Sequence, residues 1–241
     1  MALNFDEAFL DVNDAGDIPT SDNISGIELR LSQVFVKENG TIRFPPFPGF
    51  SKLYVTTIVI SDLGNVIQTL DLKGFPKVGD NEELPVDRTI FFYQKTDSSP
   101  KPPSQIHVFI SVIKSKQALR DVGKVMTSLK NDEEFAGIVS TIKSIAKDAT
   151  AAGQISDLVL QVTSIIGKFL GNVQDKPLFS WFKSFTNLGG EFDNAGISIV
   201  PKENEKVKVV INNIVRDKER EEAFLAAENV FPEDFQVTEN N

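Results

Sequence analysis

The distribution of proline limits what this chain can fold into. Eight of the twelve prolines stand between Pro45 and Pro103, and residues 104–174 contain none. Proline fixes φ and lacks a backbone N–H, so it is found in loops and at sheet edges and is excluded from helix interiors. Prolines return at Pro177 and Pro201. The pattern therefore predicts strands joined by proline-containing loops, then a helical block, then strands again.

Runs rich in β-branched and aromatic residues predict strands on both sides of the proline-free stretch. These runs are Ile27–Lys37, Thr41–Phe44, Lys52–Ser61, Val66–Leu72, Arg88–Lys95, Gln105–Lys114, Ile197–Val200 and Lys206–Val215. Asn39-Gly40 predicts a hairpin between the first two runs, and Asp62-Leu63-Gly64-Asn65 predicts another after Ser61. Both alternating faces of Gln105–Lys114 hold apolar residues, which predicts that both are covered.

Within about 116–171 the apolar spacing changes from every second residue to a helical period. Apolar stripes at Leu119–Leu129, Phe135–Ala146 and Ile155–Leu170 predict three amphipathic helices, and Gly171 is suited to end the last one. The predicted fold class is therefore α+β: an antiparallel β-sandwich of about eight strands, C2-like or jelly-roll-like, with an inserted three-helix unit.

The charge pattern divides the chain into three segments: an acidic and mobile leader (1–26), the sandwich domain (27–216), and an acidic C-terminal helix and tail (217–241). The net charge is −9; residues 1–27 carry six acids and no Lys or Arg, and residues 219–241 carry seven acids and one Arg. The middle is close to neutral, so binding of nucleic acid is not expected. Neither a signal peptide nor a transmembrane run is visible, which predicts a cytoplasmic protein or export by a signal-less route.

The residue types that most often carry catalysis are scarce. The chain has no cysteine and one histidine, His107, which stands in a predicted strand. A G-x-S-x-G nucleophile turn and the glycine-rich phosphate-binding motifs are also absent from the sequence. A structural role is favoured for His107. Enzymatic activity stays open, with the balance against it, and a carboxylate-dependent hydrolase is the enzymatic alternative.

Acidic side chains cluster in the predicted turns and suggest a calcium site. The candidate ligands are Asp62, Asn65, Asp71, Asp80, Glu82 and Asp87. Calcium takes six to eight oxygen ligands, which loops at one end of a sandwich can supply together. This arrangement resembles the architecture of C2-type domains, although no C2 motif matches residue by residue. Asp and Asn also occur in turns for local reasons, so a structural role is the alternative.

The densest aromatic segment suggests a contact surface. Its candidate contact residues are Phe179, Trp181, Phe182 and Phe185, which could meet a partner or a membrane interface; the alternative is that they pin the helical unit to the sheet. The function favoured is a non-enzymatic binding or assembly module that uses loops at one end of the sandwich, with calcium as a candidate cofactor.

Three further functions stay open: a structural subunit of a larger assembly, a membrane-active protein (lipid-binding or pore-forming), and the hydrolase. A protein partner or self-association is favoured over a small-molecule substrate, and peripheral membrane contact is a further hypothesis.

Overall fold

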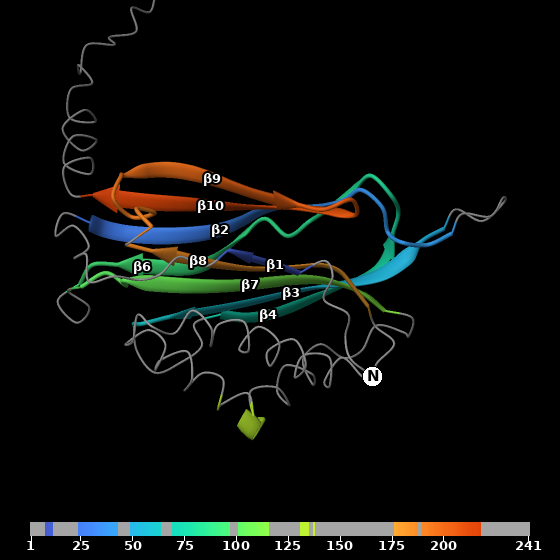
Figure 1. Cartoon of the computed structure of the whole chain (residues 1–241), viewed down its shortest axis with the longest axis horizontal. Coiled ribbons are helices and arrows are strands. Elements are labelled where there is room, and N and C mark those ends of the chain that lie inside the picture. Colours follow the sequence, from blue (N-terminus) through green and yellow to red (C-terminus); the bar gives the residue numbers. More distant parts are fainter. Residues whose placement is uncertain are drawn as a thin grey trace, which may run out of the picture.

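The described part of the chain forms two β-sheets stacked face to face (Figure 1). The computed structural model describes residues 8–11, 24–42, 49–63, 69–96, 101–115, 131–134, 137, 176–187 and 189–217. The strands are β1 (Ala8–Asp11), β2 (Ile24–Val36), β3 (Ser51–Ser61), β4 (Thr69–Val78), β5 (Glu82–Leu84), β6 (Arg88–Gln94), β7 (Gln105–Ser115), β8 (Lys176–Thr186), β9 (Gly196–Glu203) and β10 (Val207–Asp217).

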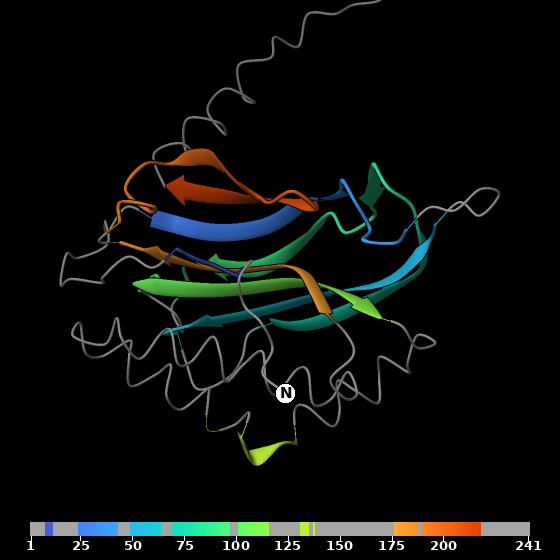
Figure 2. The ribbon, with the colours of Figure 1, turned by 45° about the vertical axis from the view of Figure 1, so that its right-hand side comes forward.

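The two sheets have five strands each. Sheet A has the order β1-β8-β7-β3-β4, and sheet B has the order β5-β2-β10-β9, with β6 also paired to β2. Every pairing is antiparallel except that of β1 with β8, which is parallel. Turning the molecule by 45° leaves the two layers distinct, with β9 at the rim of its sheet (Figure 2).

The predicted α+β class is wrong, because the described residues form a mostly β, two-sheet fold without an interpretable helix. The predicted three-helix unit at about 116–171 falls outside the described residues, apart from 131–134 and 137. The prediction relied on apolar periodicity, which is a local property. The fold class depends instead on the long-range strand pairing described above. The predicted C-terminal helix, from residue 218 onward, also lies outside the described residues.

The strand β2 shows how the sequence encodes a local irregularity. Ile27, Leu29 and Leu31 alternate inward, and Val34 then resumes the alternation one residue out of phase. A register shift against β10 between Val210 and Ile211 absorbs this extra residue, as a β-bulge does. The bulge keeps both halves of the apolar pattern on the inner face of sheet B.

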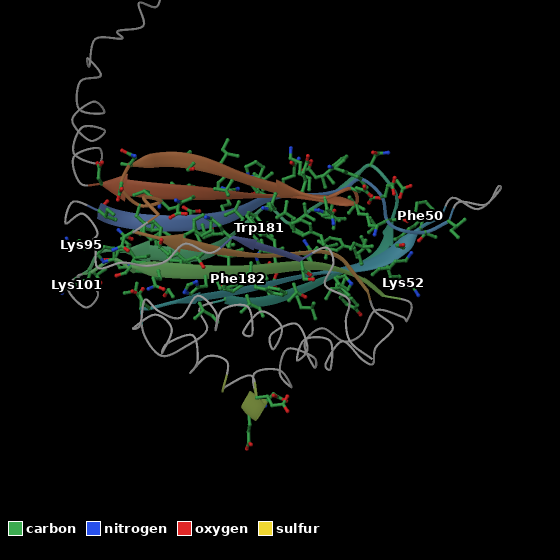
Figure 3. All side chains as sticks on the ribbon, in the orientation of Figure 1. Phe50, Lys52, Lys95, Lys101, Trp181 and Phe182 are labelled. Atoms are coloured by element: carbon green, nitrogen blue, oxygen red, sulfur yellow. The ribbon has the colours of Figure 1, made fainter. Side chains whose placement is uncertain are left out.

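One hydrophobic core joins the two sheets. β2 and β10 contribute Ile27, Leu29, Leu31, Val209 and Ile211, and sheet A contributes residues that include Val55, Val108, Ile110, Trp181 and Phe185. Trp181 is 1% exposed and lies between the layers (Figure 3). At about 25 cal/mol per Å² of apolar surface removed from water, this core is the main source of stability.

The other face of sheet A is buried as well. On β3 this face carries Tyr54 and Ile58, and on β7 it carries His107 and Phe109, none of them more than 5% exposed. The prediction that both faces of the strand Gln105–Lys114 are covered is therefore confirmed. Sheet B differs, because the outward side chains of its strand β9 are exposed.

The sequence predictions for individual strands had mixed outcomes. The hairpin of β3 with β4 is confirmed, although β4 continues to Val78, past the predicted end at Leu72, and residues 66–68 lie outside the described residues. Strands at β6, β7, β9 and β10 are also confirmed. The hairpin predicted around Asn39-Gly40 is wrong, because β2 pairs with β5, β6 and β10 instead.

Asn39 is fully buried, and its side-chain amide donates to the carbonyl oxygens of Gly49 (2.6 Å) and Val78 (2.9 Å). Strand β1 lies within the segment predicted as a leader.

Candidate binding surface

Two of the predicted calcium ligands, Asp62 and Asp80, lie at opposite ends of sheet A. Asp62 follows the C-terminal end of β3, whereas Asp80 follows the C-terminal end of β4, which is antiparallel to β3. β3 is 11 residues long, so these ends lie about 33 Å apart at roughly 3.3 Å per residue. Ligands of one calcium ion lie within about 2.6 Å of it, so Asp62 and Asp80 cannot share an ion. Asn65 lies outside the described residues.

Asp62 ties β3 to the start of β7. Its carboxylate accepts backbone N–H groups from Ser104 (2.9 Å) and Gln105 (3.3 Å). The residue as a whole is exposed, but its carboxylate lies against β7, and the resulting desolvation raises the pKa of Asp62, against the lowering effect of these donors. Its oxygens are thus already engaged in a strand connection.

Two further candidates bind arginines at the margin between β4, β6 and β2. Asp87 accepts a bidentate pair of hydrogen bonds from Arg30 at 2.6 and 2.7 Å, which holds the pKa of that carboxyl below its usual value. Asp71 pairs with Arg88 at 2.6 Å. A calcium ion would have to displace these guanidinium groups to use either carboxylate.

The last two candidates stabilise loops. Asp80 Oδ1 accepts the N–H of Asn39 (2.8 Å), and Glu82 Oε2 accepts the N–H of Gly79 (2.6 Å). Among the residues that the structure describes, no group of three or more His, Cys, Asp or Glu side chains could hold a metal. The fold brings Asp80 and Glu82 into one loop but does not bring the six candidates together, and calcium binding stays a prediction.

The predicted aromatic contact residues lie inside the folded protein. Phe179, Trp181, Phe182 and Phe185 belong to β8, which is flanked by β1 and β7, and none is more than 4% exposed. Phe179, Trp181 and Phe185 face sheet B, while Phe182 lies on the opposite face of sheet A. Contact with a partner or a membrane would require β8 to open, so that hypothesis stays a prediction.

The single histidine is buried on the outer face of sheet A. His107 Nδ1 shares a hydrogen bond with Ser184 Oγ at 2.9 Å, and the imidazole stacks on Phe182 at 5.8 Å between ring centroids. Its Nε2 atom has no hydrogen-bond partner. Burial lowers the pKa of His107 to about 4, so the ring is neutral at pH 7. A Ser–His pair is present, but it is sequestered from solvent and has no carboxylate bonded to Nε2 to complete a triad.

The most exposed apolar group on a fully described strand is on β9, the edge strand of sheet B. Ile197 is 68% exposed and Ile199 is 67% exposed, with exposed Ser198 between them and exposed Pro201 beyond. We call Ile197, Ser198, Ile199 and Pro201 the β9 edge surface. Ile42 and Phe50 are also exposed, but they flank residues 43–48, which lie outside the described residues.

The alternation of hydrogen-bonded and non-bonded residues along β9 shows which backbone groups point away from the sheet. At the hairpin with β10, Asn204 N–H donates to the Val207 carbonyl at 3.0 Å. Antiparallel pairs alternate between bonded and non-bonded, so the even-numbered residues of β9 bond to β10. Ile197, Ile199 and Pro201 therefore direct their backbone groups to the free edge. Pro201 fits this phase, because it has no N–H to give to β10.

The sequence predictions above did not include this edge, although the chain contains a signal for it. A proline within a strand indicates an edge strand or a bulge, and Pro201 directly follows the run Ile197–Val200. Across β10 from the edge, the outer face of sheet B carries both charged and apolar groups. Glu28 on β2 accepts hydrogen bonds from Thr89 Oγ1 and Arg216 Nη2, both at 2.6 Å, which lower the pKa of Glu28, and its cross-strand neighbour Phe92 is 56% exposed. The β9 edge surface is thus an apolar strip at the rim of a mixed face.

No protein-family model matches the chain, and no curated protein matches it in sequence. In the described residues, no helix has the length and apolar character needed to cross a membrane.

Proposed function

We propose that this protein is a non-enzymatic binding and assembly module whose contact site is the β9 edge surface. The observation that carries the proposal is the pairing of two isoleucines, each about two-thirds exposed, with outward backbone groups on one edge strand. Natural proteins usually protect such edges with charged residues, proline or a covering segment, because the unpaired backbone groups of an open edge can pair with a strand of another chain. Here only Pro201 interrupts the edge, and the adjacent stretch 197–199 carries no charge.

The chemistry of the described residues supports binding rather than catalysis. The one imidazole is buried and neutral, and each of the five described calcium candidates already accepts a backbone N–H or an arginine. An enzyme needs a convergent group of perturbed side chains that substrate can reach. The β9 edge surface offers instead what a protein partner uses: apolar side chains and unsatisfied backbone donors and acceptors.

The size of the strip sets the strength expected of such a contact. Full burial of an isoleucine stabilises by about 1.5–3 kcal/mol, so completing the burial of Ile197 and Ile199 contributes about 1–2 kcal/mol each. Each added backbone hydrogen bond contributes about 0.5–1.5 kcal/mol net. Association opposes these gains with about 4–15 kcal/mol of lost freedom. The surface alone therefore supports a weak, reversible contact, with a dissociation constant higher than micromolar.

Site-specific photo-cross-linking in the cells that make the protein tests this proposal. A photoreactive amino acid replaces Ile199 in one variant and the exposed Lys77, on sheet A, in a matched control. We expect a protein adduct from position 199 and little or none from position 77. Equal adduct yields at both positions, or none at either, would remove the β9 edge surface as the contact site.

A further inference from the structure

We infer that the occupant of the β9 edge surface is the β9 strand of a second copy of this chain, paired antiparallel about Ser198. The inference rests on the proposed function and names its partner. Three features of the strand support it: the order of its backbone groups, the position of its isoleucines and the charges at its two ends.

The outward backbone groups of β9 are symmetric about Ser198. Ile197 and Ile199 each direct an N–H and a C=O to the free edge, and they lie one residue to either side of Ser198. A twofold axis at Ser198 places Ile197 opposite Ile199 of the second copy, and each such pair exchanges two hydrogen bonds. The symmetric pairing therefore forms four bonds and asks for no donor from Pro201.

The same register brings the apolar side chains together. Ile197 and Ile199 lie on one face of β9, so the twofold axis gathers four isoleucines into a single cluster on the outer face of the joined sheets. Directly opposed residues of an antiparallel pair have their Cβ atoms about 4.5–5.5 Å apart. Both isoleucines of each copy lose exposure in this register, whereas a shift by two residues would place Ile197 against Pro201, which cannot donate.

The charges at the two ends of the strand are complementary in this arrangement. Asp193 precedes β9 and Lys202 stands near its end, with no charged residue between them. In this register Lys202 lies opposite Asn194 of the second copy, one residue from its Asp193. Glu203 lies opposite that Asp193, and its negative charge is offset by its ion pair with Lys37 at 3.0 Å. One strand edge buries less area than a standard interface, so the dimer is expected to depend on concentration.

A single engineered cysteine tests the register directly, because the chain has none of its own. In the inferred dimer the two Ser198 residues form a non-hydrogen-bonded pair with Cα atoms about 4.5 Å apart, which lies within disulfide range. The control Lys202→Cys lies on the same face of β9, but its two copies would be about 27 Å apart at roughly 3.4 Å per residue. Under mild oxidation we expect Ser198→Cys to form a disulfide dimer at least ten times faster than Lys202→Cys. Equal rates would overturn the inferred register.

A proline variant tests the edge pairing, because it removes both the outward N–H and the exposed side chain of Ile199. Ile199→Pro removes an outward N–H that β10 does not use, as Pro201 already does two residues away. Sedimentation equilibrium should show at least a tenfold weaker dimer for Ile199→Pro, with unchanged Trp181 emission as the check on folding. A monomeric wild type at several hundred micromolar would overturn the second copy as occupant. If the wild type is monomeric and the photo-cross-link from position 199 identifies a different protein, the proposed function stands and only the second copy as occupant is refuted. If position 199 gives no adduct at all, the proposed function and this inference both fail.

Discussion

The buried histidine predicts a defined loss of stability in acid. The folded pKa of His107 is about 4, against about 6.5 in an unfolded chain, because burial disfavours the charged ring. Above pH 6.5 both states are neutral at this position, and the group has no effect. As the pH falls below 6.5, the unfolded chain takes up a proton that the folded protein does not, so the native state loses stability until the pH reaches about 4.

The magnitude follows from the difference between these two pKa values. Each pKa unit is worth about 1.4 kcal/mol, so a change from pH 7.5 to pH 4.5 should lower the free energy of unfolding by about 2 to 3 kcal/mol through His107 alone. The control is His107→Gln, which does not titrate and can keep a hydrogen bond to Ser184. Carboxylates titrate in both proteins, so their effects cancel in the difference.

Urea unfolding followed by Trp181 fluorescence measures this difference, since Trp181 is the only tryptophan and is buried. We expect the wild type to lose about 2 to 3 kcal/mol relative to His107→Gln between pH 7.5 and pH 4.5. A stability difference that stays constant across this range would refute the reasoning, because it would mean that folding leaves the pKa of His107 unchanged, as for a ring in contact with solvent.

Three other perturbations have expected outcomes. Asn39→Ala should lower the free energy of unfolding by about 2–5 kcal/mol in urea melts, because it leaves the buried carbonyl of Val78 and the half-buried carbonyl of Gly49 without this donor; a loss below 1 kcal/mol would contradict that role. Lys183 and Glu191 form a largely buried ion pair at 2.8 Å, so Glu191→Gln, which leaves the Lys183 charge buried without its partner, should destabilise the protein by about 2–4 kcal/mol. The double variant Lys183→Met with Glu191→Leu leaves no buried charge and should lose less stability; equal losses would contradict this explanation. The calcium hypothesis predicts about 2.7 kcal/mol of stabilisation at 100 times the dissociation constant, visible as a rise in Tm of roughly 5–10 °C, and identical melts in calcium and in chelator would remove it.

The strands that the sequence predicted correctly are those whose apolar pattern repeats every second residue. The β3–β4 hairpin and the strands β6, β7, β9 and β10 could be located from alternation and turn residues alone. Which strands pair across long sequence separations could not be located in this way. Strand β8 carries a lysine, Lys183, on its inner face and begins with Lys176-Pro177, so its aromatic residues resembled a loop contact rather than a buried strand.

The candidate site shows the same division. Asn39-Gly40 has the composition of a hairpin turn, but burial of the Asn39 side chain in a network with Gly49 and Val78 overrides that local preference. Acidic residues near predicted turns suggested calcium ligands, yet the antiparallel course of β3 and β4 places Asp62 and Asp80 at opposite ends of sheet A, with Asp71 between those ends on β4. The exposure of Ile197 and Ile199 depends on β9 being an edge strand. In the sequence, only Pro201 indicates that position.

Amide hydrogen exchange along β9 in dilute solution tests the central claim most directly. The backbone phase assigns the N–H groups of Ser198 and Val200 to the ladder with β10 and those of Ile197 and Ile199 to the open edge. We predict that Ile197 and Ile199 exchange far faster than Ser198 and Val200 in the monomer. Slow exchange at all four positions would show that the edge is already covered, and it would contradict a binding surface there.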